Sequence, residues 1–305
     1  MTVDLLKQGV RVTPVAGSLG AQVDGLQLRE LSDEGFTVLH QALLDHQVVF
    51  VRGQHLTEQE HLDFASRWGQ PMAHPVARLA GDVRVISPVE DTADSPPTAD
   101  QWHSDITYWP EPPKIGVLCA LTLPDAGGDT LWSSLYAAYD ALSEPLRTLA
   151  DGLCALHAPS AHFVRSWTQR HGSEEGSLIA KYMAGAVLPL VRTHDETGRQ
   201  ALFYTNGMTI QGVAPAENDL LMELFHNLVS DPNRSLRWRW AEGDVAIWDE
   251  RCTNHRALSD HYPRYRLMRR CTIQGDRPFF RPAGAQKALI VARAAESIAP
   301  GETTK

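Results

Sequence analysis

The sequence has few cysteines and shows no pairing pattern among them. Its four cysteines, Cys119, Cys154, Cys252 and Cys271, are widely spaced, and no two of them form a CxxC motif. This usage predicts reduced, mostly buried thiols in a cytoplasmic protein rather than a disulfide framework. Cys252 lies three residues before a histidine, but a free cysteine is usually a small core residue.

Long hydrophobic runs and positive charge are also lacking. No apolar run approaches the roughly 20 residues that span a bilayer, and residues 1–12 lack the apolar segment of a signal peptide. The net charge of -9 disfavours a nucleic-acid partner, which would call for a basic face. Only 21% of residues are charged, which argues against wholesale disorder. We therefore expect a folded protein with neither a membrane nor a nucleic acid as partner.

The chain is long enough and apolar enough for one large domain. It has 305 residues, of which 43% are hydrophobic, and we find no repeat or linker that divides it, so we predict a single domain over 1–305. Strand patterns lie at 47–51, 115–123 and 265–273, and 236–240 with 245–248 is typical of a hairpin. Short strands with scattered helices predict a mainly β fold with flanking helices, a β-sandwich or jelly roll.

Helix signals are local and clear. Ser32 predicts the start of one helix, and Thr57 with Glu60 forms a capping box for a second helix ending near 68–69. The apolar spacing of Leu221, Leu224, Phe225 and Leu228 predicts an amphipathic helix. Two aperiodic segments, 87–101 and 158–186, are candidate lids over a site. The tail at 283–305 is expected to hold a short helix and then fray.

Three H-x-[DE] motifs compete as metal ligands. The pair at His61 lies inside the capped helix, where residues two apart do not share a face, and the pair at His194 runs into a Thr-Gly turn. Only His103 and Asp105 lie in a run, 102–108, with strand character. Residues i and i+2 of a strand project to one face, so this pair is favoured.

A second segment supplies a further histidine and two arginines. His255 is the proposed third ligand, although a hydrogen-bonded loop histidine remains the alternative. Two histidines and a carboxylate hold non-haem Fe(II) and leave positions open. Arg266 and Arg270 share one face of the following strand, and buried arginines require anionic partners. A dicarboxylate co-substrate would satisfy them, and so would ordinary salt bridges to neighbouring strands.

These motifs resemble the Fe(II)/2-oxoglutarate-dependent dioxygenases of the taurine dioxygenase (TauD/TfdA) family. The resemblance runs from about residue 10 to 281 and is densest at 102–105, 127–132, 238–240 and 243–249, continuing through the second histidine to the two arginines. It implies a double-stranded β-helix (jelly-roll) core. It also implies Fe(II), 2-oxoglutarate and O2 as cofactor and co-substrates, and a homo-oligomer, dimer or tetramer. The roles that it implies are metal ligation by His103, Asp105 and His255, 2-oxoglutarate binding by Thr130 and Arg266, and substrate binding by Arg270 and His74.

Two departures from the type enzyme bear on the substrate. The positions of its taurine-contacting tyrosine and asparagine fall at Ala77 and Ala99, neither of which can form a side-chain hydrogen bond. Met208 lies near a position that is often aromatic and would suit an adaptable apolar wall. The alternative to 2-oxoglutarate binding by Thr130 is an ordinary hydroxyl within a strand. The alternative to substrate binding by His74 is a loop residue whose hydrogen bonds are satisfied within the protein.

The resemblance implies hydroxylation of an aliphatic carbon, next to a heteroatom, with succinate and CO2 as co-products. A small anionic substrate such as a sulfonate, alkyl sulfate ester or phenoxyalkanoate fits, and taurine itself is disfavoured. A natural-product or amino-acid-derived intermediate is an alternative substrate. Retention of Asp105 favours hydroxylation over halogenation. The readings from other classes are a non-catalytic metal-binding jelly roll and a zinc hydrolase with Asp249 or Glu250 as general base.

Overall fold

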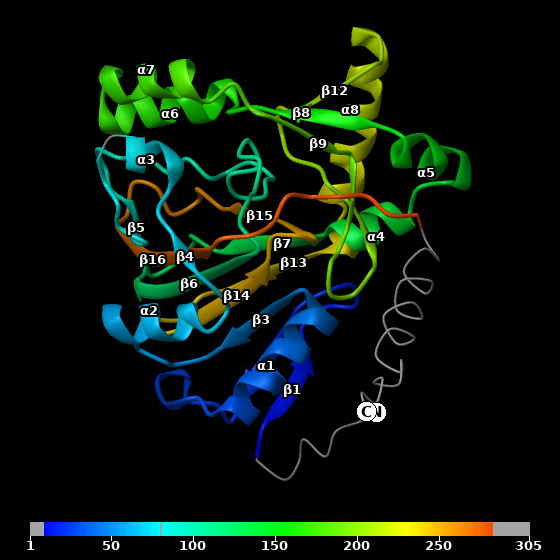
Figure 1. Cartoon of the computed structure of the whole chain (residues 1–305). Coiled ribbons are helices and arrows are strands. Elements are labelled where there is room, and N and C mark those ends of the chain that lie inside the picture. The colour runs from blue at the N-terminus through cyan, green and yellow to red at the C-terminus, as the bar shows by residue number, and fades with distance from the viewer. Residues whose placement is uncertain (1–8, 80, 283–305) are drawn as a thin grey trace, which may run out of the picture.

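An eight-stranded sheet dominates the computed structural model, which describes residues 9–79 and 81–282. The strand order is β1-β2-β3-β14-β6-β16-β4, and β5 also pairs with β16 (Figure 1). All these pairs are antiparallel except β2 with β3. The strands are β1 (Arg11–Pro14), β2 (Ala21–Asp24), β3 (Val48–Val51), β4 (Pro71–Met72), β5 (Ile86–Asp91), β6 (Ile115–Thr122), β14 (Val245–Asp249) and β16 (Arg266–Ile273).

Three smaller sheets complete the β structure of the described residues. One has the order β13-β7-β15, another pairs β10 with β11, and the third has the order β12-β8-β9. Their strands are β7 (Thr130–Ser134), β8 (Cys154–His157), β9 (Ala186–Pro189), β10 (Val191–Thr193), β11 (Gln200–Leu202), β12 (Thr209–Ile210), β13 (Ser235–Trp238) and β15 (Thr253–Ala257).

The large sheet and the β13-β7-β15 sheet enclose a common aromatic core. Phe50 of β3 stacks on Trp238 of β13 with ring centroids 3.9 Å apart, and it meets Trp132 of β7 edge-on at 5.3 Å. The alternate residues of β3, Val49 and Val51, face the other way, into a second core under α1 (Asp33–His46) and α2 (Glu58–Ser66). Side chains buried on both faces explain why β3 is a continuous apolar run. The predicted mainly β, jelly-roll fold with flanking helices is confirmed.

The helices begin where their capping residues predict. Ser32 accepts a hydrogen bond from the Gly35 N–H at 3.1 Å, and Thr57 and Glu60 form both bonds of a capping box. The amphipathic helix expected around Leu221 is α8. The helices are α1 (Asp33–His46), α2 (Glu58–Ser66), α3 (Pro75–Leu79), α4 (Leu135–Asp140), α5 (Glu144–Asp151), α6 (Ala161–His171), α7 (Ser173–Tyr182) and α8 (Pro215–Ser230), with short 3-10 turns at Leu28–Glu30 and Pro232–Arg234.

The predicted hairpin of 236–240 with 245–248 is wrong. Both strands exist, but β13 pairs with β7 in the small sheet, whereas β14 pairs with β3 and β6 in the large one. The turn between them crosses from one layer of the sandwich to the other. Gly243 at φ 81° supports this turn, because a Cβ there would lie 2.6 Å from the His55 ring. A pattern of alternating residues gives a strand but does not give its partner.

Both candidate lids contain more regular structure than expected. Residues 86–91 form β5, which pairs along β16, so only the part after Asp91 is a loop. Most of 158–186 is helical, with α6 and α7 packed against each other and, together with α3, on one side of the molecule (Figure 1). The predicted tail at 283–305 lies outside the described residues. None of the helices in 9–79 or 81–282 is long and apolar enough to cross a membrane.

Candidate metal centre and cavity

Two segments far apart in sequence form the centre of the candidate site. The backbone N–H of His103 donates to the carbonyl of His255 at 3.0 Å, and the reverse bond measures 2.8 Å. This two-residue bridge fixes a loop, which arrives from β5, against strand β15 of the small sheet. Both imidazoles leave this bridge on the same side, with ring centroids 4.2 Å apart.

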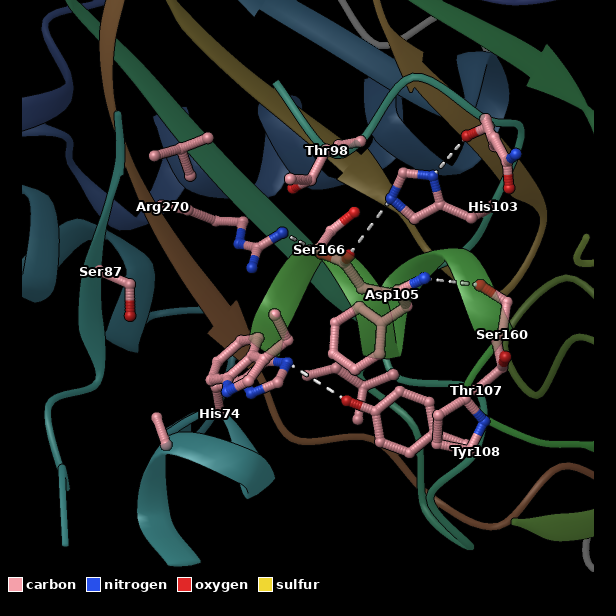
Figure 2. Close-up of a pocket in the computed structure, with 18 of the residues that line it drawn as sticks. His74, Ser87, Thr98, His103, Asp105, Thr107, Tyr108, Ser160, Ser166 and Arg270 are labelled. Atoms are coloured by element: carbon pink, nitrogen blue, oxygen red, sulfur yellow. Dashed lines mark hydrogen bonds and ion pairs between the residues drawn. The ribbon is translucent and has the colours of Figure 1, made fainter. Parts of the chain in front are cut away.

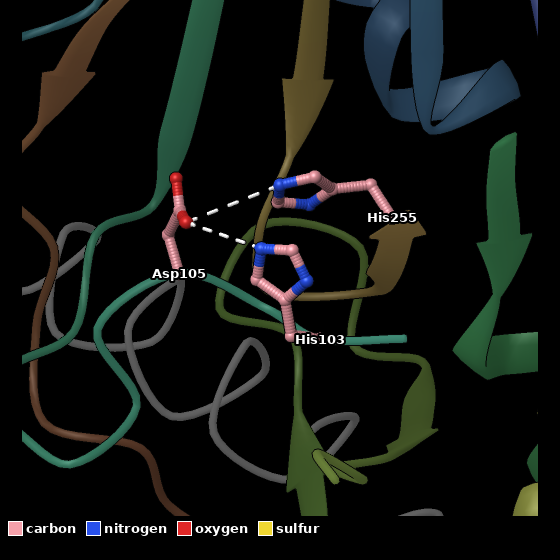
Figure 3. Close-up of side chains that lie close together, drawn as sticks. All are labelled: His103, Asp105 and His255. Atoms are coloured by element: carbon pink, nitrogen blue, oxygen red, sulfur yellow. Dashed lines mark ion pairs between the residues drawn. The ribbon is translucent and has the colours of Figure 1, made fainter. Parts of the chain in front are cut away.

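Asp105 lies beside the two histidines because a turn, and not a strand, positions it. The predicted strand at 102–108 is limited to the bridge at His103, and a turn begins at Asp105. Ile106, the next residue, has φ 53°, a conformation that is costly for a β-branched side chain. The turn nevertheless brings Asp105 Oδ1 to 3.6 Å from His103 Nε2 and 3.9 Å from His255 Nε2 (Figure 3). The pair that the i, i+2 argument favoured therefore does lie together with His255, but through a turn and not along a strand.

The two histidines present their Nε2 atoms to the carboxylate. His103 Nδ1 lies 2.7 Å from the carbonyl of Gln101 and must donate to it, which fixes the ring with Nε2 towards the carboxylate. Burial lowers the pKa of His255 to about 3, and His103 adds to the shift, so the His255 ring is neutral at physiological pH. The indole of Trp248 packs on the His255 ring at 5.1 Å. The His255 ring is thus held as a neutral nitrogen donor, and the His103 ring presents its Nε2 to the same carboxylate.

Arg270 occupies the other oxygen of Asp105. Its Nη1 lies 2.8 Å from Asp105 Oδ2, while Oδ1 is the oxygen turned towards the histidines. Burial alone would raise the pKa of the Asp105 carboxyl, but the charge of Arg270 lowers that pKa well below its usual range. Asp105 is therefore an ionised carboxylate whose Oδ1 faces the two histidines.

The three side chains fit a divalent transition metal. Their donor atoms all lie within 4.8 Å of one another, and the group is largely buried. Two neutral imidazoles and one carboxylate are typical ligands of non-haem Fe(II), and they leave coordination positions for small molecules. A metal-binding histidine usually donates its other ring N–H to a nearby acceptor. The hydrogen bond from His103 Nδ1 to the Gln101 carbonyl is such a contact.

A cavity of about 490 Å³ opens beside these ligands. His103, Asp105 and Arg270 contribute to its wall, as do the small residues Ala77 and Ala99. The opposite side is aromatic, and Figure 2 shows His74 and Tyr108 meeting there, with Tyr108 OH 3.2 Å from His74 Nε2. The aromatic wall consists of His74, Tyr108, Phe163 and Trp167.

Sequence reasoning missed three members of the aromatic wall. Tyr108 follows the metal motif closely, and Phe163 and Trp167 come from α6, where their i, i+4 spacing could have predicted one helix face. Trp167 lies flat on His74, with centroids 4.9 Å apart and planes at 14°.

Arg266 and Thr130 are both buried, and Arg266 is bonded to the segment that leads into Thr130. Arg266 is 2% exposed, its Nε donates to the Gly128 carbonyl at 3.0 Å, and its Nη1 is 3.8 Å from Asp91. A Cβ on Gly128 would lie 2.9 Å from Arg266 Cδ, which explains the glycine two residues before Thr130. The Thr130 hydroxyl accepts a hydrogen bond from Trp240 Nε1 at 3.0 Å. Neither residue lines the cavity beside the metal ligands.

Met208 does not lie in the wall of the cavity, where it was expected. It is buried in a core cluster with residues of α4, α8 and β11 and does not line the cavity. The expected apolar wall is supplied by α6 instead.

A second group of residues that could bind a metal is already occupied by an arginine. His194, Asp249 and Cys252 lie together, but Arg251 donates to both oxygens of Asp249 and fills the space with a guanidinium. Burial raises the pKa of Cys252 well above its usual value, so it stays a thiol. Of the rejected motifs, His61 lies inside α2 and His194 in a turn after β10, as predicted.

The fold and the three-ligand site define a class of enzyme. The family described as "Taurine catabolism dioxygenase TauD, TfdA family" matches residues 11–272, most of the chain. The chain therefore belongs to the TauD/TfdA dioxygenase family, as the motifs indicated.

Individual relatives agree with this family. An alpha-ketoglutarate-dependent sulfate ester dioxygenase of Pseudomonas putida is 34% identical over 277 residues, 88% of this chain and 90% of the relative. An alkylsulfatase of Acinetobacter baylyi is 32% identical over 276 residues, 88% of this chain and 86% of the relative. A crystal structure of a taurine dioxygenase from Burkholderia xenovorans has a TM-score of 0.73 and 31% identity, covering 89% of this chain and 93% of that one.

Proposed function

We propose that the protein is an Fe(II)/2-oxoglutarate-dependent dioxygenase that hydroxylates an aliphatic carbon of a small anionic substrate. The observation that carries this proposal is the placement of His103, Asp105 and His255 beside a cavity that also holds Arg270. In this proposal the carbon lies next to a heteroatom, so its hydroxylated product fragments to a carbonyl compound and a released anion.

Alkyl sulfate esters are the substrate class that we favour. Two relatives of this chain are named as an alkylsulfatase and a sulfate ester dioxygenase. The cavity supports applying their substrate class to this chain. It offers Arg270 for the sulfate anion and the aromatic wall for the alkyl chain. Ala77 and Ala99 line it without side-chain hydrogen bonds, which is unfavourable for the amino group of taurine. Sulfonates and phenoxyalkanoates are the substrate classes that we rank second. A natural-product or amino-acid-derived acid ranks third.

Each set of residues would perform one physical task. Bound Fe(II), with 2-oxoglutarate and O2, would supply the oxidising chemistry and release succinate and CO2. Asp105 and the two histidines would hold the ion, and Arg266 with Thr130 would hold the distal carboxylate of 2-oxoglutarate. Arg270 would orient the substrate anion, which is a positioning contribution. The loop after β5 and the α6–α7 pair would exclude water as covers.

Neither alternative class gains support from the site. A zinc hydrolase needs a general base beside the metal, but Asp249 is paired with Arg251 and His194. The carboxylate of Glu250 accepts from the Asp105 N–H and from the Trp248 indole. A non-catalytic jelly roll would not need the buried Arg266. The homo-oligomer stays a prediction, which light scattering of the purified protein tests.

The test is succinate release from 2-oxoglutarate with Fe(II) and O2 across alkyl sulfates, sulfonates and phenoxyalkanoates. We expect stimulation by alkyl sulfates of medium chain length and none in the Asp105→Ala variant. Stimulation by another class alone would overturn the substrate assignment. Absence of succinate from iron-loaded wild type with every substrate, together with no 2-oxoglutarate binding, would overturn the reaction.

A further inference from the structure

One buried carboxylate connects both metal-binding segments. Glu250 lies in the turn between β14 and β15 and is 1% exposed. Its Oε2 accepts a hydrogen bond from the backbone N–H of Asp105 at 3.0 Å. Its Oε1 accepts one from Trp248 Nε1 at 2.7 Å. Both oxygens of this side chain are therefore committed to positions next to the metal ligands.

The contact with Asp105 is the last of three consecutive attachments of the same loop. His103 is attached through its backbone bridge to His255. Ser104 donates to the Thr253 carbonyl at 2.8 Å and accepts from the Asn254 side chain at 2.8 Å. The Asp105 backbone is then attached by Glu250. The loop is thus fixed, residue by residue, to one short stretch of chain.

Asp105 needs this last attachment because of the turn that follows it. Ile106 has φ 53°, and a β-branched residue holds such a conformation only when surrounding contacts impose it. The bond from the Asp105 N–H to Glu250 is one such contact, immediately before the strained residue. Without it, the ion pair with Arg270 would be left to hold the Asp105 carboxylate beside the two histidines, on a backbone that is no longer fixed before the strained residue.

The contact with Trp248 extends the same control to the other ligand. The Trp248 indole packs on the His255 ring at 5.1 Å, and its N–H is held by Glu250. We infer that Glu250 is a positioning residue for the metal centre, setting Asp105 directly and His255 through Trp248. This inference rests on the proposed function only in that the three ligands bind a metal.

Metal affinity of the folded protein tests this role. Mn(II) is titrated calorimetrically into metal-free wild type and Glu250→Gln, with the melting temperature of each recorded. An amide has only one acceptor oxygen, so Gln can keep only one of the two bonds. We expect the Mn(II) affinity to fall by roughly 10- to 100-fold, the usual effect of losing an outer partner of a metal ligand. Affinity within about twofold of wild type, in a folded variant, would overturn the inference.

A matched control separates positioning from general loosening of the turn. Asp249→Asn makes the same chemical change in the neighbouring buried carboxylate, whose partners are Arg251 and His194. We expect its melting temperature to fall while its Mn(II) affinity stays within about twofold of wild type. An equal loss of affinity in both variants would refute a specific role for Glu250.

A second variant decides the matter if Glu250→Gln does not fold. Trp248→Phe keeps the ring against His255 but removes the N–H that holds Glu250 Oε1. A smaller fall in affinity in the same direction is expected, and unchanged affinity would count against the inference. Failure of wild type itself to bind Mn(II) would instead refute the proposed metal site.

Discussion

Arg270 and Asp105 form a direct ion pair, with Nη1 2.8 Å from Oδ2. This contact joins the arginine proposed to hold the substrate anion to a carboxylate proposed to hold the metal. It leaves the other oxygen of Asp105 facing His103 and His255 (Figure 3). Substrate recognition and metal coordination would therefore share one side chain.

Replacing Arg270 with Gln should weaken substrate recognition. Hydrogen bonds to charged groups contribute about 1.5–3 kcal/mol, so kcat/KM for the anionic substrate should fall roughly 10- to 100-fold or more. Arg269→Gln is the matched control, because Arg269 faces the other side of β16 and bonds the Leu56 carbonyl. Steady-state kinetics of both variants decide the question. Equal effects in the two would mean that the loss reflects the strand and not the anion.

Arg266→Gln should act on 2-oxoglutarate instead. Removing one partner of a buried charge pair costs about 2–5 kcal/mol, so the affinity for 2-oxoglutarate should fall at least roughly 30-fold. Thr130→Ser, which keeps the hydroxyl that accepts from Trp240, should change it little. Calorimetry on Mn(II)-loaded protein measures this without turnover. Unchanged affinity in Arg266→Gln would place the co-substrate elsewhere.

Trp167→Ala should change which substrates fit. Removing this ring from the aromatic wall enlarges the cavity beside His74, so the preferred alkyl chain should become longer or bulkier. Val164→Ala is the control, because Val164 packs in the same α6 cluster but does not line the cavity. A profile of rate against chain length should shift only in the first variant. The same profile in both would show that the ring does not limit the substrate.

His157 should make the protein sensitive to acid. Burial lowers its pKa from 6.5 to about 4, and its ring stacks on Phe203, which also faces Arg192. The unfolded chain therefore binds a proton between these pH values and the folded chain does not, so stability falls as pH drops from 6.5 towards 4. The loss reaches up to about 3 kcal/mol. In urea unfolding, the stability of wild type relative to His157→Phe should fall as the pH drops through this range, whereas a constant difference would contradict the assignment.

Local signals in the sequence predicted much of the fold, and long-range pairing was the part that failed. Ser32 and Thr57 determine helix starts through contacts three residues away, so these starts could be read directly. The partner of β13 depends on how the chain crosses between sheets, which no local pattern encodes. The helices at 161–182 were not predicted because the several His, Ser and Gly residues of this segment obscure the i, i+4 pair Phe163 and Trp167, whose apolar partners Val76 and Tyr108 come from other segments.

The candidate site also has a part that the sequence predicted and a part that it could not predict. The residue types and spacing of His103, Asp105 and His255 were sufficient to select them, and the structure brings them together. The strained turn at Ile106 and the two bonds of Glu250 were not predictable, because both depend on the assembled β14–β15 turn. Met208 was misplaced because its sequence neighbourhood gave no indication of the core cluster that buries it.

Oxygen uptake measured together with succinate formation tests the central claim most directly. Iron-loaded wild type, given 2-oxoglutarate and a medium-chain alkyl sulfate, should consume O2 and form succinate in equal amounts. His255→Ala, folded and treated identically, should do neither. No O2 uptake by wild type with any substrate class, or equal uptake by His255→Ala, would contradict the account.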